Sequence, residues 1–155
     1  MELIITSDEE MQVLGENLSS ILSENDIVFL IGELGVGKTT LVKGLAKGLN
    51  YKENVSSPTF SLMNIYETSP KIYHFDFYRL EGCEITDIGI DDYLHNDGIA
   101  IIEWANIGGD QLPEADYLLY IDLIDDDYDN PRKVTIKANS QKIEELSDIV
   151  SVSGR

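Results

Sequence analysis

The spacing of apolar residues divides the chain into alternating helices and strands. Apolar residues recur every three or four positions from Met11 to Leu22 and from Leu41 to Leu49, as on one face of an α-helix. Between these segments, Ile27–Ile31 is continuously apolar and rich in strand-forming residues, as in a strand that is buried on both sides of a sheet. The pattern predicts a buried strand followed directly by a helix, with a glycine-rich turn between them.

The remaining elements follow from local signals. Ser7 and Glu10 have the spacing of a capping box, so the first helix is expected to begin at Ser7. The second helix is expected over about residues 38–49. Alternation of helices and strands indicates one α/β domain with a mixed sheet over residues 1–155, ending in a short helix and a frayed tail from about residue 140. Further strands are predicted at residues 3–6, 60–66, 72–78, 99–103, 117–123 and 133–137, and the last helix at 141–146.

The turn after the first buried strand carries a phosphate-binding motif. Residues 32–39 read Gly-Glu-Leu-Gly-Val-Gly-Lys-Thr and match G-x-x-x-x-G-K-[ST] at every fixed position. Glycines let the backbone N–H groups point inward at phosphate oxygens, and the helix directs its positive end at the same anion. Lys38 supplies charge for the β- and γ-phosphates, Thr39 a hydroxyl for Mg²⁺, and Thr40 lies near the α-phosphate. We therefore expect ATP and Mg²⁺ to bind, with nucleotide contacts from Glu33, Leu34, Gly35, Val36, Gly37, Lys38, Thr39 and Thr40.

A P-loop also needs a carboxylate that holds the water shell of the metal, usually at the end of a neighbouring apolar strand. Glu103 follows the apolar run 99–102, and Asp76 follows the run 72–75. One is expected to hold the metal and the other to orient water or sense the γ-phosphate, but spacing alone does not assign the two roles. Thr59 is a further candidate for a γ-phosphate contact, although a proline turn before a strand would give the same sequence.

Charge and composition limit the class of protein. Asp and Glu number 29 against 11 Lys and Arg, so the formal net charge is −18. Direct binding to RNA or DNA is not expected, because it normally needs a basic surface. A basic protein surface is a better partner, although the charge can also serve solubility alone. No apolar run reaches the roughly 18–20 residues of a membrane span. With the single cysteine, Cys83, this predicts a soluble cytoplasmic protein.

Other polar residues are given no ligand role. His74 is interpreted as a packed polar strand residue. The acidic residues between 122 and 129 lack the spacing of an EF-hand and are interpreted as a solvated loop. A small P-loop kinase is a rival class, but its lid needs arginines, which occur only at 79, 132 and 155. The strings that mark a GTPase, Asn-Lys-x-Asp and Asp-x-x-Gly, do not occur. A nucleotide-dependent scaffold with negligible turnover stays open.

Four motifs in order resemble one family. They are the P-loop at 32–40, Ser-Pro-Thr-Phe at 57–60, His-Phe-Asp-Phe-Tyr-Arg-Leu at 74–80 and Ile-Glu-Trp at 102–104. Over about residues 7–132 the chain closely resembles the TsaE (YjeE) family, small bacterial P-loop ATPases of tRNA threonylcarbamoyladenosine (t6A) synthesis. A P-loop alone is widespread, whereas its combination with the other motifs is specific.

The resemblance implies a P-loop NTPase fold with a mostly parallel central sheet, an antiparallel addition and flanking helices. It implies that Thr39 and Glu103 bind Mg²⁺, that Asp76 lies near the γ-phosphate as a catalytic or switch residue, and that Thr59 belongs to a switch loop. The implied catalytic set is Asp76, Lys38, Thr59 and Glu103.

The resemblance also implies a base site and partners. Ser7 to Glu9 and Arg132 would lie by the adenine and ribose. The protein would dock on the TsaD–TsaB complex, with TsaC upstream in the pathway, and its slow ATP hydrolysis would reset that complex between turnovers. Contact with tRNA would be only indirect, through the complex.

Overall fold

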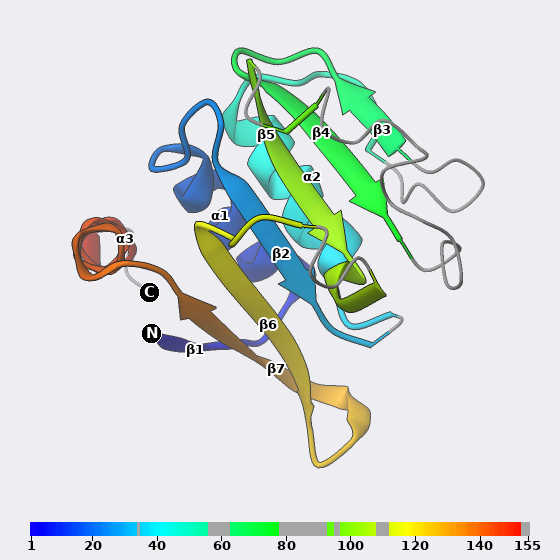
Figure 1. Ribbon diagram of the computed structural model, residues 1–155. Helices are drawn as coiled ribbons and strands as arrows, with labels where there is room; N and C mark the ends of the chain where they lie inside the picture. The colour runs from blue at the N-terminus through cyan, green and yellow to red at the C-terminus, as the bar shows by residue number, and fades with distance from the viewer. Residues whose placement is uncertain (34, 56–62, 78–92, 95–96, 108–111, 153–155) are drawn as a thin grey trace.

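In the computed structural model, the described part of the chain forms a seven-stranded sheet with helices packed against it (Figure 1). The structure describes residues 1–33, 35–55, 63–77, 93–94, 97–107 and 112–152. The strand order is β1-β7-β6-β2-β5-β4-β3, in which the four central strands are parallel and β1, β7 and β3 add antiparallel edges. The predicted α/β fold with a mostly parallel centre and an antiparallel addition is confirmed. The strands are β1 (Glu2–Ile5), β2 (Ile27–Ile31), β3 (Met63–Tyr66), β4 (Lys71–Asp76), β5 (Gly98–Glu103), β6 (Tyr117–Ile124) and β7 (Asp127–Lys137).

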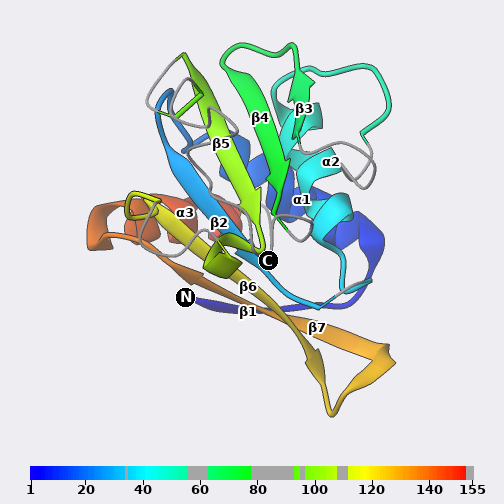
Figure 2. The ribbon, with the colours of Figure 1, turned by 45° about the vertical axis from the view of Figure 1, so that its right-hand side comes forward.

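Three α-helices are described, α1 (Asp8–Ser19), α2 (Lys38–Gly48) and α3 (Ser140–Val152), together with a short 3₁₀ helix, η4 (Ala105–Ile107). α1 begins as predicted, because the Ser7 hydroxyl accepts a hydrogen bond from the Glu10 amide at 3.1 Å. In both views, α1 and α2 lie together behind the sheet (Figures 1 and 2). None of the described helices is both long and apolar enough to span a bilayer.

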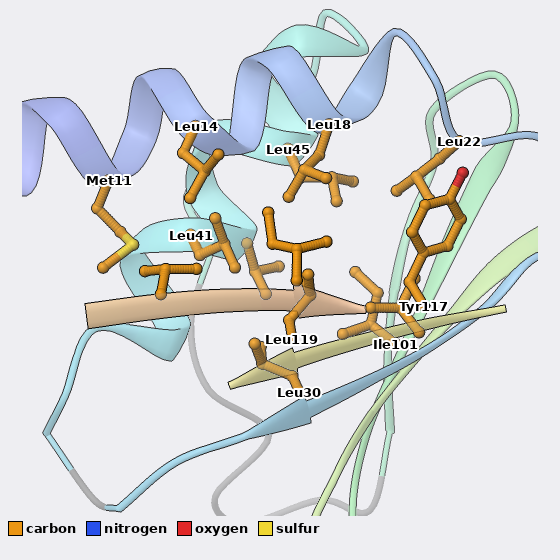
Figure 3. Packing of buried hydrophobic residues seen from close by; sticks show 14 of the residues in the cluster. Met11, Leu14, Leu18, Leu22, Leu30, Leu41, Leu45, Ile101, Tyr117 and Leu119 are labelled. Atoms are coloured by element: carbon orange, nitrogen blue, oxygen red, sulfur yellow. The ribbon is translucent and has the colours of Figure 1, made fainter. Parts of the chain in front are cut away.

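The main core lies between this helical layer and the sheet (Figure 3). Leu14 and Leu18 of α1 and Leu41 and Leu45 of α2 are all buried. Full burial of each such side chain stabilises the fold by about 1.5–3 kcal/mol. The opposite face of β2, β4 and β5 carries a second buried cluster, which explains their continuous apolar sequences. The sheet contributes to the main core with Leu30, Ile101, Tyr117 and Leu119, among others.

The two largest differences from the predicted boundaries are six residues each, at the start of β7 and at the end of α3. The strand expected at 133–137 begins at Asp127, so part of the acidic segment that was interpreted as a loop is strand. Asp125 and Asp126 both have positive φ, 55° and 53°, and form a two-residue hairpin turn that lets pairing continue to the tip. The last helix runs to Val152 instead of ending at residue 146, because Leu146 and Val150 are both buried in the main core.

Two glycines lie where the backbones of α1 and α2 are in close contact. A Cβ atom placed on Gly44 would lie 2.0 Å from the carbonyl oxygen of Gln12, and one on Gly15 would lie 2.3 Å from that of Leu41. Real Cβ atoms do not come so near to backbone. The absence of a side chain at these positions therefore sets how near the two helices pack.

We predict that Gly44→Ala lowers the free energy of unfolding by about 1–3 kcal/mol, the usual cost of overpacking, because backbone must move to admit the methyl group. Urea denaturation at neutral pH measures the change. Lys43→Ala is the matched control on the same helix, since Lys43 is exposed, and it should leave stability nearly unchanged. Equal stability of the two variants would contradict this account of the helix contact.

Candidate nucleotide-binding site

Parallel strands bring three sequence motifs to one edge of the sheet. β2, β4 and β5 end side by side, and such carboxyl ends form the usual ligand edge of an open α/β sheet. Glu103, the last residue of β5, has Leu30 of β2 and Asp76 of β4 as its register partners. Register partners on parallel strands project from the same face, so both acids lie on the face that α2 covers.

The glycine loop connects β2 to the N-terminus of α2. Gly35 and Gly37 have φ of 80° and 118°, in the left-handed region where a side chain would be strained. Gly37 is the N-cap and has no side chain to cap the helix, and the first turn contains no acid. α1, in contrast, is capped by Ser7 and has three acids in its first turn. The N-terminus of α2 thus has neither the side-chain cap nor the acidic residues that offset the positive end of α1. Its free N–H groups and positive dipole end can therefore bind an external anion.

Lys38 is buried at the first position of α2, with 6% of its surface exposed. Its Nζ donates to the carbonyl oxygen of Gly32 at 2.7 Å and lies 3.3 Å from Oε1 of Glu103. The ammonium also lies 5.1 Å from the centre of the Trp104 ring. The P-loop lysine and the carboxylate at the end of β5, which are far apart in sequence, are therefore in contact.

Glu103 is 3% exposed, and both of its oxygens have partners. Oε1 faces Lys38 and Oε2 lies 2.6 Å from Nε2 of His74. Burial by itself would raise the pKa of Glu103, but the hydrogen bond and charge of His74, together with the charge of Lys38, outweigh it and hold the pKa below its ordinary value. The carboxylate is therefore ionised at neutral pH, as a magnesium site requires.

The donor set fits a magnesium ion that keeps most of its own waters. Within the described ranges, no three His, Cys, Asp or Glu residues gather as a metal cage. Mg²⁺ is usually held by one or two protein oxygens plus phosphates and water. Thr39, which follows Lys38 in the first turn of α2, and Glu103, which contacts Lys38, would supply those oxygens. Asp76 is half-buried at the adjacent strand end.

Trp104 follows the carboxylate directly. Its φ of 58° lies in the left-handed region, which is uncommon for a bulky aromatic residue and typical of functional sites. This conformation turns the chain out of β5 into η4. On that side of the P-loop, Glu33 and Trp104 line a cavity of about 240 Å³.

A second cavity, of about 180 Å³, lies on the α1 side of the loop and joins two further predicted residues. Ser7 and Arg132 both line it, together with Met11 and Tyr128, which were not predicted. Arg132 Nε donates to the carbonyl oxygen of Val36 at 3.1 Å, which ties this cavity to the P-loop. Glu9, predicted with Ser7, is exposed and does not line the cavity.

Two predicted residues, Leu34 and Thr59, lie outside the described part of the chain, so their roles stay predictions. The position of His74 next to Glu103 was not predicted. The signal was available, because His74 precedes Asp76 by two residues on a predicted strand and must therefore project from the same face.

The glycine loop between β2 and α2, with its lysine facing a strand-end carboxylate, defines a P-loop NTPase fold. The family described as "Threonylcarbamoyl adenosine biosynthesis protein TsaE" matches residues 5–134. The chain belongs to this TsaE family, which confirms the resemblance seen in its motifs.

Individual relatives agree with this assignment. The tRNA threonylcarbamoyladenosine biosynthesis protein TsaE of Bacillus subtilis is 35% identical over 92% of the chain and 89% of its own length. The protein of the same name in Treponema pallidum is 34% identical over 88% and 99%. That of Haemophilus influenzae is 48% identical over 64% and 65%. The crystal structure of Bacillus subtilis YdiB matches the whole chain and 96% of its own, with a TM-score of 0.80 at 28% identity.

The lowered pKa of Glu103 predicts a pH-dependent contribution to stability. When folding lowers the pKa of a carboxyl group, the group stabilises the folded protein at pH values above the pKa that it has in the unfolded chain. This contribution is lost as the pH falls through the pKa that it has in the folded protein. Glu103→Gln, which resembles the protonated acid, should be less stable than the unchanged protein at neutral pH. The gap should narrow below the ordinary pKa of 4.5. Urea denaturation of both proteins across this range measures the gap, and a constant difference would count against the ionised carboxylate.

Proposed function

We propose that this protein binds ATP with Mg²⁺ and hydrolyses it as the ATPase component of t6A synthesis. The main support for the proposal is the ion pair between Lys38 and Glu103, which lies by the glycine loop at the carboxyl edge of the sheet. In this proposal Lys38 would bind phosphate and Glu103 would bind the metal, and their contact supports the proposal because the phosphates and Mg²⁺ of ATP–Mg²⁺ are adjacent.

Nucleotide binding is supported by the groups around the loop. Lys38 would exchange the Gly32 carbonyl and Glu103 for phosphate oxygens, because phosphate is the stronger partner for an ammonium. The N-terminus of α2 would add backbone N–H groups to the same anion. The cavity shared by Ser7 and Arg132 is next to the loop and would receive the nucleoside.

Hydrolysis would depend on the two strand-end acids. Glu103 and Thr39 would hold Mg²⁺, which when bound neutralises charge on the phosphates. Asp76, in register beside Glu103, would orient the attacking water or respond to the γ-phosphate. An ionised Glu103 is suited to the metal, which leaves the less buried Asp76 for the second role.

The partner would be the TsaD–TsaB complex. Membership of the TsaE family supports a place in t6A synthesis. The net charge of −18 favours docking on a basic protein surface and disfavours autonomous binding of tRNA. ATP turnover would then reset the complex in the cytoplasm, and tRNA would be reached only through that complex.

We predict that Lys38→Ala weakens ATP binding by about 2–5 kcal/mol, the range for truncating one member of a buried charge pair. Isothermal titration calorimetry with ATP and Mg²⁺ measures the loss. Lys43→Ala removes an exposed lysine from the same helix and should bind ATP as before. Unchanged affinity in Lys38→Ala would remove the P-loop assignment.

We predict that ATP turnover is slow for the isolated protein and rises when TsaD–TsaB is added. Phosphate release under both conditions tests this, with Asp76→Asn as the variant that should bind ATP yet fail to respond. No turnover in either condition, with intact ATP binding, would favour a nucleotide-dependent scaffold. Full turnover in Asp76→Asn would exclude Asp76 from the mechanism.

A further inference from the structure

His74 lies in the middle of β4 and is completely buried. Its Nε2 is 2.6 Å from Oε2 of Glu103, and its Nδ1 is 3.4 Å from the hydroxyl of Tyr66 on the neighbouring strand β3. Tyr66 is itself 3% exposed and packs against Tyr51, with ring centres 5.3 Å apart. The imidazole therefore has a partner at each nitrogen, the carboxylate of Glu103 and the hydroxyl of Tyr66, and the Tyr66 ring is held in place by its packing on Tyr51.

The contacts define the direction of the hydrogen bonds. An ionised carboxylate only accepts, so Nε2 of His74 carries the hydrogen that bonds to Glu103 in either protonation state of the ring. In the neutral ring, Nδ1 then accepts from the Tyr66 hydroxyl. Tyr66 thus favours the tautomer that donates to Glu103.

The two oxygens of Glu103 have different partners. Oε1 faces Lys38, whose ammonium can exchange one hydrogen-bond acceptor for another. Oε2 is held by the buried ring of His74. If Lys38 pairs with a phosphate, Oε1 loses its partner and Oε2 does not. The carboxylate would then stay in place, with Oε1 available to another partner.

We propose that His74 is a positioning residue that fixes Oε2 of Glu103 so that Oε1 is presented to the magnesium ion or its water shell, with Tyr66 setting the tautomer. This inference rests on the proposed function, since it assigns a role within the same site. His74 does not touch the reacting groups and acts through Glu103.

The fold alone does not call for a histidine here. Ile72, two residues earlier on the same face, is fully buried, and the register partner of His74 on β5 is the buried Ile101. An apolar residue would continue that surface, whereas a polar group at full burial must be compensated by hydrogen bonds and brings little net stability. The position of the ring next to the proposed metal ligand accounts for the exception.

A pair of variants separates the positioning role from a packing role. His74→Gln places an amide N–H near the position of Nε2, whereas His74→Asn is one methylene shorter and its amide cannot reach Glu103. Calorimetry gives two quantities for each protein, the affinity for ADP in EDTA and the affinity of the ADP complex for Mg²⁺. We expect His74→Asn to weaken Mg²⁺ binding by about 10–100-fold, the usual effect of losing an outer-shell partner. Its ADP affinity in EDTA should be unchanged, and His74→Gln should recover most of the Mg²⁺ affinity.

Tyr66→Phe supplies a second measurement that leaves the histidine in place. It removes the hydroxyl that favours the donating tautomer and keeps the ring packed on Tyr51, so Mg²⁺ binding should weaken less than in His74→Asn. This variant decides the question if His74→Asn does not fold.

Several results would overturn the inference. Unchanged Mg²⁺ affinity in a folded His74→Asn, or in Tyr66→Phe when the former does not fold, would show that Glu103 needs no such support. Equal losses in the Asn and Gln variants, or a parallel loss of ADP affinity in EDTA, would indicate packing alone. Failure of the unchanged protein to bind ADP at all is a separate outcome, which would remove the proposed function itself.

Discussion

The buried carboxylate of Glu103 is the constraint on which the arrangement of the site depends. An ionised group in a protein interior needs close partners of opposite charge or hydrogen-bond donors, and here they come from two different elements. Lys38 arrives from the start of α2 and His74 from the middle of β4, so one side chain at the end of β5 connects the glycine loop to the sheet. β2, β5 and β4 are neighbouring parallel strands, so their carboxyl ends lie side by side at one edge of the sheet. This alignment brings the three side chains together.

Much of the site could be predicted because its signals are local. The glycine loop and Lys38 form one continuous motif, and its flanking strand and helix each have a clear hydrophobic period. Glu103 and Asp76 were recognisable as acids that end apolar runs. The sequence could not assign their roles, because burial and charged partners distinguish them. Glu103 is enclosed by Lys38 and His74, whereas Asp76 is more exposed.

The features that escaped prediction depend on contacts between distant residues. His74 and Glu103 are separated by 29 positions, and Arg132 and Val36 by 96. Such contacts follow from the strand order, which hydrophobic spacing does not reveal. The early start of β7 has a different cause, because two aspartates adopt a left-handed turn that is more usual for asparagine or glycine. Because the segment that begins at Asp127 is acidic, its sequence does not resemble a strand.

The second half of the glycine loop is supported from outside as well as by its own sequence. Arg132 holds the carbonyl of Val36, and the Cε of Met11 lies 3.3 Å from where a Cβ on Gly37 would stand. Fixing one residue of free backbone costs about 1–2 kcal/mol of conformational entropy at room temperature. For Val36 and Gly37, this entropy is lost when the protein folds and not when a ligand binds. Ligand capture by this part of the loop should therefore lack the large negative heat-capacity change that accompanies coupled folding and binding.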